Sequence, residues 1–493
     1  MYKEGMALVQ EGRLTDAIET FERGLSFDSR NLVLLDAIGA TYTLEGDNRR
    51  AQQYLEKALQ VDPKFVPARK NIAISYFNSN QYDLAVPEFE SLIADPRSSA
   101  VANLFLGIIA ERRAEYGKSA LFLEKSGELA YGYPQALLSW AHSLYELRQP
   151  PKAEAILTRF DVLSRVSAQE YFQAGLLYSQ HGQDKKALAD YDRANVTAPE
   201  LPGLSYQRAI TLDRLGRSPE AVEVLKDLTA RQPEADSLNL LAHVAEKTGD
   251  LRLAIQSLRQ AAELAPQKED NYLDFSTICL DYENYPLALE IANVGLAHIP
   301  NSYRLLVQKG AILDKLGRRD KAEEVFREAS KLQADNSVAL LSLAITQTHA
   351  RHFQDAIGTL SSAVDRFPGN YYMHYYLGNI LVQMGETGEL NDEMRQKAER
   401  ELREGIRLNP SFADSYYQLS KLLLHQNPKL AEENLLTCLR LDPEHASAEY
   451  ELGHLYLRTG RQKEGQRLID RFISQQEAEK LKEQQKPRVE ATQ

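Results

Sequence analysis

The sequence has little cysteine and no long apolar run. Its 493 residues include only two cysteines, Cys279 and Cys438, which lie far apart in apolar stretches. No disulfide framework and no zinc-binding spacing can be built from such a pair. A helix needs about 20 mostly apolar residues to cross a membrane. With a mean hydropathy of −0.43, no such span is expected.

Positively charged residues are also fewer than negatively charged ones. The chain carries 58 lysines and arginines against 70 aspartates and glutamates, which gives a net charge of −12. Nucleic acid and anionic membranes are therefore poor candidates as partners. The first residues, MYKEGMALVQEGRL, lack the basic and apolar regions of a secretory signal, which predicts a cytoplasmic location. If the natural start lies upstream, a signal there would make the protein exported or periplasmic instead.

Known catalytic motifs are missing as well. The sequence contains no P-loop, no glycine-rich dinucleotide motif after a strand, no GxSxG and no HExxH. His349 and His352 are three residues apart, but no carboxylate or cysteine completes a metal-binding set with them. We therefore predict no enzymatic activity, no catalytic residues, no cofactor and no metal site.

Small residues recur at a fixed interval. Alanine, glycine or serine returns at steps of 34 residues, with departures of 33, 42 and 33. The members of this first column are Gly5, Gly39, Ala73, Gly107, Ala141, Gly175, Ala209, Ala242, Ser276, Gly310, Ala344, Gly378, Ser420 and Gly453. A second column of small residues, which starts at Ala17, Ala51 and Ala85, follows at the same interval. Two such columns in each unit predict two helices that cross closely.

Turn residues separate the helices of each unit. Glycine often stands between the two helices, as at Gly46, Gly182 and Gly385, and proline often closes the second, as at Pro63 and Pro199. Apolar residues surround each small residue, as in LDAIGATYTL at 35–44. One helix pair cannot bury its own apolar faces, so the pattern predicts an all-α solenoid of stacked pairs.

The repeat resembles the tetratricopeptide repeat family, whose pattern is Trp-x2-Leu-Gly-x2-Tyr, then Ala-x3-Phe, then Ala and Pro. Repeat six shows the pattern in Tyr171, Ala174, Gly175, Tyr178, Gly182, Ala187, Tyr191, Ala194 and Pro199. The resemblance implies a right-handed superhelical solenoid of about 14 stacked helix-turn-helix units over residues 1–474. Residues 475–493 are expected to form a polar helix end, broken at Pro487, and a disordered tail. Met1 already falls inside the first helix of repeat one, so the natural start lies upstream or this helix frays.

The resemblance also implies that function lies in the concave groove, which the first helices of the pairs line. Neighbouring opposite charges in this groove, such as Glu111 with Arg112, argue against a single strongly charged ligand and favour a solvated surface. The lysine, asparagine and arginine clamp known in one subset of the family is not expected, because Phe105 follows Lys70 and Asn71 where a polar residue is needed. The single tryptophan, Trp140, falls at an internal position and is predicted to be core.

Side-chain amides recur at one groove position, in Asn71, Gln173, Gln207, Gln308 and Gln418. Such amides can bond the backbone of an extended peptide through both donor and acceptor. Glutamine is also a good exposed helix former. Both interpretations stay open at the level of sequence.

Tyrosines collect on the groove positions of the last three repeats. We predict a partner-binding surface made of Tyr372, Tyr375, Tyr376 and Asn379 in repeat 12, Tyr417, Gln418 and Lys421 in repeat 13, and Tyr450 and His454 in repeat 14. Tyrosine offers a large rigid contact area and a hydroxyl at low entropy cost, and it is enriched at binding hot spots. The alternative is that these tyrosines only pack within the array. In the same stretch, His374 is predicted to pack against the helix pair.

Repeat 12, residues 371–412, holds the one large insertion. Eight extra residues within GETGELNDEMRQK separate its two helices. Thr387 or Asn391 can cap a helix, and MRQKAERELREGIRL is strongly helix-forming. We predict that the second helix is longer by about two turns and projects from the edge of the array. The insertion is either a partner contact or a tolerated addition to an exposed turn.

Three functions agree with these features. The leading hypothesis is a non-enzymatic scaffold or adaptor whose groove binds an extended peptide or protein segment. A second is an assembly or transport component of a bacterial-type envelope or secretion machine. A third is the non-catalytic repeat arm of a transferase complex, which requires a catalytic domain elsewhere. The sequence predicts no oligomeric state.

Overall fold

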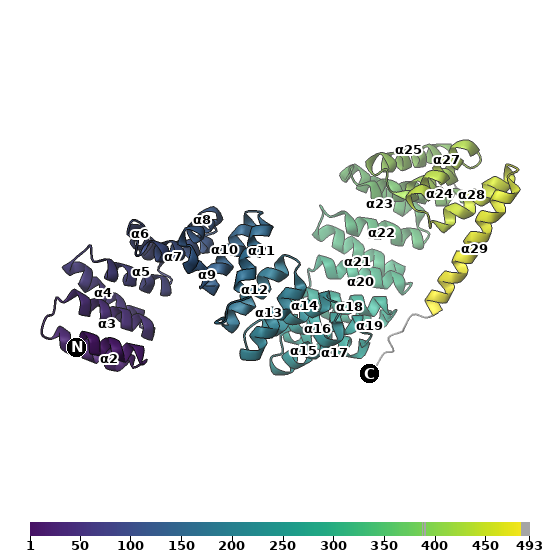
Figure 1. Cartoon of the computed structure of the whole chain (residues 1–493). Coiled ribbons are helices and arrows are strands. Elements are labelled where there is room, and N and C mark those ends of the chain that lie inside the picture. Colours follow the sequence, from purple (N-terminus) through teal and green to yellow (C-terminus); the bar gives the residue numbers. More distant parts are fainter. Residues whose placement is uncertain (387, 389–390, 485–493) are drawn as a thin grey trace. The chain divides into compact units, whose positions relative to one another are not determined.

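The computed structural model describes residues 1–386, 388 and 391–484, and every regular element in these ranges is an α-helix (Figure 1). Thr387, one of the two predicted caps, lies outside the described residues, as do Pro487 and the predicted tail from residue 485 on. The chain divides into two compact units, Met1–Arg217 and Ser218–Gln493.

The first unit runs from α1 to α14. Its helices are α1 (Tyr2–Gln10), α2 (Leu14–Leu25), α3 (Leu32–Glu45), α4 (Asn48–Val61), α5 (Val66–Asn78), α6 (Tyr82–Leu92), α7 (Ser99–Arg112), α8 (Tyr116–Ser126), α9 (Glu128–Tyr131), α10 (Pro134–Glu146), α11 (Pro150–Phe160), α12 (Ala168–Gln180), α13 (Asp184–Thr197) and α14 (Leu204–Arg214). The short α9 is an addition to the repeat pattern, and it follows Gly127, whose φ of +60° ends α8.

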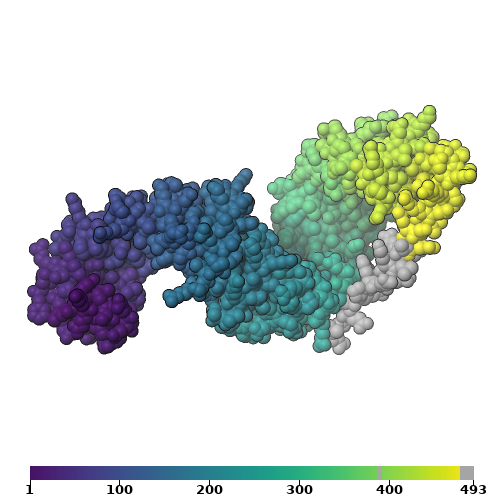
Figure 2. Space-filling model, viewed as in Figure 1, coloured from purple at the N-terminus to yellow at the C-terminus, as the bar shows by residue number. Residues whose placement is uncertain are grey.

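The second unit runs from α15 to α29. Its helices are α15 (Ser218–Arg231), α16 (Ala235–Lys247), α17 (Leu251–Leu264), α18 (Glu269–Asp281), α19 (Tyr285–His298), α20 (Tyr303–Lys315), α21 (Arg319–Leu332), α22 (Ser337–His349), α23 (Phe353–Arg366), α24 (Tyr371–Glu386), α25 (Asp392–Leu408), α26 (Ala413–Leu423), α27 (Pro428–Leu441), α28 (Ala446–Arg458) and α29 (Gln462–Gln484). Most helices that are consecutive in sequence pack against each other within each unit. Side chains close the spaces between neighbouring helices (Figure 2).

The small-residue columns mark the helix crossings, as predicted. A Cβ atom added to Gly107 would lie 2.5 Å from Leu123 of the partner helix, and one added to Gly310 would lie 2.6 Å from Phe326. No real Cβ atom tolerates such distances, so at these two crossings only glycine lets the two backbones approach this closely. The all-α architecture of paired, stacked helices is therefore confirmed.

The turn between the helices of a pair needs a left-handed residue. Gly46 and Gly182 supply it with φ of +90° and +71°. Repeats without a glycine at this point place another residue in the same conformation, for example Asn80 and Arg351 at φ of +57° and +63°. The turn is thus a property of the repeat, and glycine adopts it at the lowest steric cost.

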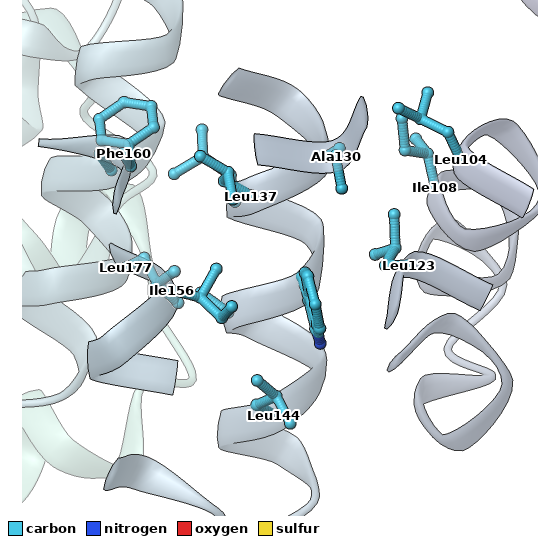
Figure 3. Close-up of a cluster of buried hydrophobic side chains, with 14 of the residues drawn as sticks. Leu104, Ile108, Leu123, Ala130, Leu137, Leu144, Ile156, Phe160 and Leu177 are labelled. Carbon is cyan, nitrogen blue, oxygen red and sulfur yellow. The ribbon is translucent and has the colours of Figure 1, made fainter. Parts of the chain in front are cut away.

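Apolar side chains from successive pairs fill the core of the first unit. Figure 3 shows Leu104, Leu123, Leu137, Phe160 and Leu177, which come from five helices and are all buried in one cluster. Trp140 belongs to the same cluster and is 8% exposed, which confirms its predicted place in the core.

The insertion in repeat 12 differs from the prediction. The second helix, α25, has 17 residues against 14 in α23, so it gains less than one turn instead of two. The first helix, α24, has 16 residues against 13 in α22 and continues through Gly385. Gly385 is therefore helical and is not the turn residue; Gly388, with φ of +85°, takes the left-handed conformation. The extra residues extend both helices because each extension adds backbone hydrogen bonds, and Asn391 caps α25 as predicted.

Candidate partner-binding surface

Five aromatic residues gather where α24 begins. We call Tyr371, Tyr372, Tyr375, Tyr376 and Phe412 the aromatic cluster. Phe412, the residue before α26, is its centre: the ring centroids of Tyr371 and Tyr372 each lie 5.3 Å from that of Phe412, and that of Tyr375 lies 5.0 Å away. Tyr371 and Tyr372 stack at 4.3 Å. The cluster thus ties the start of α24 to the segment that leads into α26, and it orients the tyrosines by edge-to-face contacts.

Members of the cluster differ in exposure. Tyr372 is 40% exposed and Tyr376 is half-buried, so both present ring surface to solvent. Tyr375 is only 8% exposed, and its burial raises its pKa well above the ordinary tyrosine value. Placing Tyr375 on the binding surface is therefore corrected: its ring packs with Leu402 and Leu419 in the core between the two repeats.

Gln418 needs the same correction. Its side chain is 9% exposed and lies beside Tyr375, because both residues lie where α24 and α26 face each other. Other amides of this column also bond within the array: Asn71 donates to Asp36 at 2.8 Å, and Gln308 donates to Thr277 at 3.1 Å. The structure therefore favours a role for these three amides between neighbouring repeats over a peptide-binding ladder.

His374 is a structural residue, which confirms its predicted packing. Its Nδ1 lies 2.7 Å from Glu401 Oε2 and its Nε2 lies 3.1 Å from the carbonyl oxygen of Pro368. Each ring nitrogen faces an acceptor, and only the imidazolium can donate a proton to both. The hydrogen bond with Glu401 therefore raises the pKa of His374. The side chain ties α24 to α25 and to the preceding turn, and it is 5% exposed.

Tyr417 lies next to the aromatic cluster, on α26. Its ring is half-buried and lies 4.8 Å from the imidazole of His445, whose Nε2 is 3.2 Å from Asp414 Oδ1. The ammonium of Lys421 lies over the same ring, 5.7 Å from its centroid. The ring of Tyr417 therefore contacts both Lys421 and His445.

A pocket of about 590 Å³ opens beside these residues. We call it the basic pocket. It is lined by Val382, Gly385, Arg395, Lys421, Leu422, Leu424, His425, Gln426, Tyr450, Glu451, His454 and Arg458. Three permanent cations and two histidines meet there with a single carboxylate, although the whole chain has a net charge of −12. Its size is in the range of pockets that hold small ligands or peptide side chains.

Tyr450 forms one wall of the basic pocket and is 39% exposed. Its ring centroid lies 4.3 Å from the imidazole of His454 and 4.9 Å from the ring of Phe472. Tyr450 is on α28 and Phe472 is on α29, so contact with the last helix fixes the orientation of the tyrosine ring. A fixed aromatic ring loses little rotamer entropy when a ligand binds.

The nine predicted residues thus separate into three groups. Lys421, Tyr450 and His454 line the basic pocket. The second group is three tyrosines outside the pocket, Tyr372, Tyr376 and Tyr417, together with Asn379. Asn379 is half-buried and accepts a hydrogen bond from Gln383 at 3.4 Å. The other two, corrected above, are internal.

Sequence reasoning missed four residues of this region: Phe412, Arg395, His425 and Arg458. Arg458 occupies a groove position, so the column count alone could have found it. The others fall outside the columns, since Arg395 is on a second helix, His425 follows α26 and Phe412 precedes it. Only the stacking of α24, α25, α26 and α28 brings them to the surface that the tyrosines share.

The two histidines with metal-like spacing each pair with a separate carboxylate. Nδ1 of His349 lies 2.9 Å from Asp314, and Nδ1 of His352 lies 2.9 Å from Glu323. Within residues 1–386, 388 and 391–484, no group of three or more histidines, cysteines, aspartates or glutamates has a metal-binding arrangement. Cys279 and Cys438 are both buried as free thiols.

Models of one repeat family match four parts of the chain. Matches to models described as tetratricopeptide repeat cover residues 42–104, 206–269, 303–336 and 341–389. These four segments of the chain are tetratricopeptide repeats.

Two named relatives of this tetratricopeptide repeat chain are distant. A TPR repeat-containing protein, MJ1428 of Methanocaldococcus jannaschii, is 22% identical over 275 residues, which cover 56% of the chain and 46% of that protein. Cellulose synthase 1 operon protein C of Komagataeibacter xylinus is 26% identical over 253 residues, which cover 46% of the chain and 18% of that protein. The matched region thus spans less than half the length of either relative.

Solved structures of similar proteins include yeast Tom70 and a chain of the Cut9–Hcn1 hetero-tetramer of the APC/C. Tom70 is 16% identical with a TM-score of 0.41, and the match covers 98% of this chain and 95% of that chain. The Cut9–Hcn1 chain is 14% identical with a TM-score of 0.36, and the match covers 92% and 95%. Both TM-scores are below 0.5, so neither structure informs the function. Among the described helices of this tetratricopeptide repeat protein, none combines the length and apolarity that crossing a bilayer requires.

Proposed function

We propose that this protein is a non-catalytic interaction scaffold whose first-helix surface in repeats 12–14 binds an extended segment of another protein. The observation that carries the proposal is the grouping of exposed Tyr372 and half-buried Tyr376 with the basic pocket on α24, α26 and α28. Exposed, held aromatic rings beside a concave polar site are typical of protein-binding surfaces. Tetratricopeptide repeats act as protein-binding modules in general, which agrees with this proposal.

Affinity capture with mass spectrometry tests this function. The full chain should be compared with a Tyr372→Ala, Tyr376→Ala double variant. Tyr375 stays intact, because its removal would open the core and confound the result. The matched control is Phe27→Ala, which removes an aromatic ring that is 81% exposed in the first unit. We expect the double variant to lose specific protein partners that the control retains. Identical partner lists for all three proteins, with normal circular dichroism, would remove the tyrosine surface from the proposal.

A further inference from the structure

A second pocket is lined by residues of α27, α28 and α29, and we call it the α27–α29 pocket. Its volume is about 550 Å³, and it shares no lining residue with the basic pocket. Four leucines supply apolar wall: Leu436 and Leu439 of α27, Leu452 of α28 and Leu468 of α29. Two glutamates and two arginines also line it, so its formal charges balance. A pocket of this size and lining can hold a small ligand or a side chain of another protein.

The carboxylate of Glu449 is the unusual group in this pocket. Glu449 is 1% exposed, and its Oε1 accepts a hydrogen bond from Arg471. Within the described residues, no donor lies within hydrogen-bonding distance of its Oε2, which is buried as well. A buried carboxylate oxygen without a donor costs free energy, because it has lost its hydrogen bonds to water. The pocket therefore contains an acceptor that a ligand can satisfy.

Other repeats place a hydrogen-bond donor where Glu449 stands. Glu449 lies four residues before Gly453, the small residue of its repeat, and six residues after Pro443. In four other repeats the equivalent residue donates to the carbonyl oxygen of the equivalent proline. These bonds run from Tyr272 to Pro266, His374 to Pro368 and Tyr416 to Pro410, each at 3.1 Å, and from Arg69 to Pro63. A carboxylate only accepts, so Glu449 cannot make this bond to Pro443, which also lines the pocket.

A phenol meets these requirements better than a cation does. Arg467 and Arg471 line the pocket together with its two glutamates, so no net negative charge attracts an ammonium group. A phenol brings an apolar ring for the leucines and one O–H donor, and its hydrogen bond to a carboxylate is strong because the acceptor is charged. Tyr272 and Tyr416 already place a phenol at the equivalent position of repeats 9 and 13.

We propose that the α27–α29 pocket binds a tyrosine side chain of a partner protein, with the hydroxyl donating to Oε2 of Glu449 and the ring against the leucines. Apolar surface continues around the lining residues: Leu436 is 47% exposed, Leu441 of α27 is 37% exposed and Ile473 of α29 is 49% exposed. Apolar neighbours of the tyrosine in the same segment can cover this surface, which favours a protein segment over a free phenol. The site is a second contact, separate from the surface of the proposed function.

Fluorescence anisotropy on the full chain tests this inference. The probes are rhodamine-labelled pentapeptides Ala-Leu-X-Leu-Ala in which X is tyrosine, phenylalanine or lysine. Unlabelled N-acetyl-tyrosinamide is the competitor that represents a free phenol. The test variant is Glu449→Leu, which should fold because buried leucines occupy the equivalent position of other repeats. Those leucines are Leu35, Leu137, Leu238 and Leu306. The matched control is Glu444→Gln, which removes one negative charge from an exposed residue outside the pocket.

We expect the tyrosine peptide to bind the wild type and the control at least about 10-fold more tightly than the phenylalanine and lysine peptides, because only tyrosine combines the ring with a donor. In Glu449→Leu the advantage of tyrosine over phenylalanine should fall below about twofold, because the acceptor is gone. N-acetyl-tyrosinamide should compete only at a concentration at least about 10-fold above that of the unlabelled tyrosine peptide, since it leaves the flanking apolar surface uncovered.

A second variant gives an independent readout. Glu449→Tyr puts the phenol into the chain itself, as in repeats 9 and 13. We expect a higher melting temperature than in the wild type, because the new hydroxyl can donate to Pro443. The tyrosine peptide should bind this variant at least about 10-fold more weakly, because the pocket is filled.

Four results would overturn the inference. They are no binding of the tyrosine peptide to the wild type, an equal preference for tyrosine over phenylalanine in the wild type and in Glu449→Leu, tighter binding of the lysine peptide than of the tyrosine peptide, and competition by N-acetyl-tyrosinamide as effective as that by the peptide. None of these measurements involves Tyr372 or Tyr376, so failure at this pocket can be told from failure of the proposed function.

Discussion

Repeats 10 and 14 both place a charged residue near the end of the first helix of the pair, Asp314 in α20 and Arg458 in α28, and surround it differently. In repeat 10, Asp314 lies 2.9 Å from His349 of the next repeat and 3.9 Å from Arg319. In repeat 14, Arg458 and Glu451 both line the basic pocket, and Arg458 makes no ion pair within 4.0 Å among the described residues. The difference teaches that a groove position does not define a binding residue. The neighbouring repeat decides whether a charge is used within the array or stays available to a ligand.

The same comparison applies to the tyrosines of repeat 12. Tyr372 and Tyr375 are three residues apart on one helix, yet one is 40% exposed and the other 8%. Helix α26 and Phe412 cover Tyr375, whereas part of the Tyr372 ring stays open to solvent.

The largest expected effect comes from substituting these two tyrosines one at a time and comparing the stability of the two variants. Tyr375→Ala should destabilise the protein by about 3 kcal/mol, because it empties core volume between two repeats. Tyr372→Ala should cost less than about 1 kcal/mol, because its ring is partly in solvent. Urea unfolding followed by circular dichroism measures both. Equal losses for the two variants would contradict the division into core and surface.

A second test addresses the crossing of α24 and α25. Gly378→Val should destabilise by about 2 to 3 kcal/mol, because an added Cβ would lie 2.6 Å from Leu402. The control is Gly358→Ala in α23, where a Cβ meets open space. That change should stabilise by about 0.5 to 1 kcal/mol through helix propensity. A neutral Gly378→Val variant would mean that the repeat-12 pair tolerates wider spacing than the structure shows.

His374 gives a pH-dependent test. Its pKa is raised in the folded state, so the stability it contributes is fully present below the unfolded value of about 6.5 and is lost as pH rises through the folded value. We expect His374→Ala to be less stable than the wild type by about 2 kcal/mol near pH 6, with a smaller difference near pH 9. Phe27→Ala, at an exposed position of the first unit, serves as control because it removes no ionisable group. A difference that does not change with pH would show that the imidazolium charge is unimportant.

The smallest expected effect is a difference in stability between variants of a paired and of an unpaired arginine. Arg461→Gln should lower the melting temperature, because it breaks a two-bond contact with partly buried Glu432. Arg458→Gln should change stability by less than about 0.5 kcal/mol, since Arg458 is exposed and makes no ion pair within the described residues. Thermal melts at low salt give the most sensitive comparison. A larger loss for Arg458→Gln than for Arg461→Gln would reverse the assignment of the two side chains.

Much of the fold could be predicted because its determinants are local and repeated. Gly107 and Gly310 recur in phase with the helix crossings, and the left-handed turn falls at the same point in repeat after repeat. The insertion was the exception: the helix-forming stretch before Leu408 gave no sign that α24 would also lengthen and move the turn from Gly385 to Gly388. Helix propensity says which residues can be helical, and it does not say how an insertion is shared between two helices.

The sequence by itself determined the repeat, the pairing of helices, and the core position of residues such as Trp140, because a period of 34 residues and the helical period are both legible along the chain. Only the tertiary structure decided which of the repeat-12 tyrosines stays exposed and which cations meet in the basic pocket. Arg395, Lys421 and Arg458 belong to three different helices. Their convergence depends on how those helices stack, and no spacing within one helix encodes it.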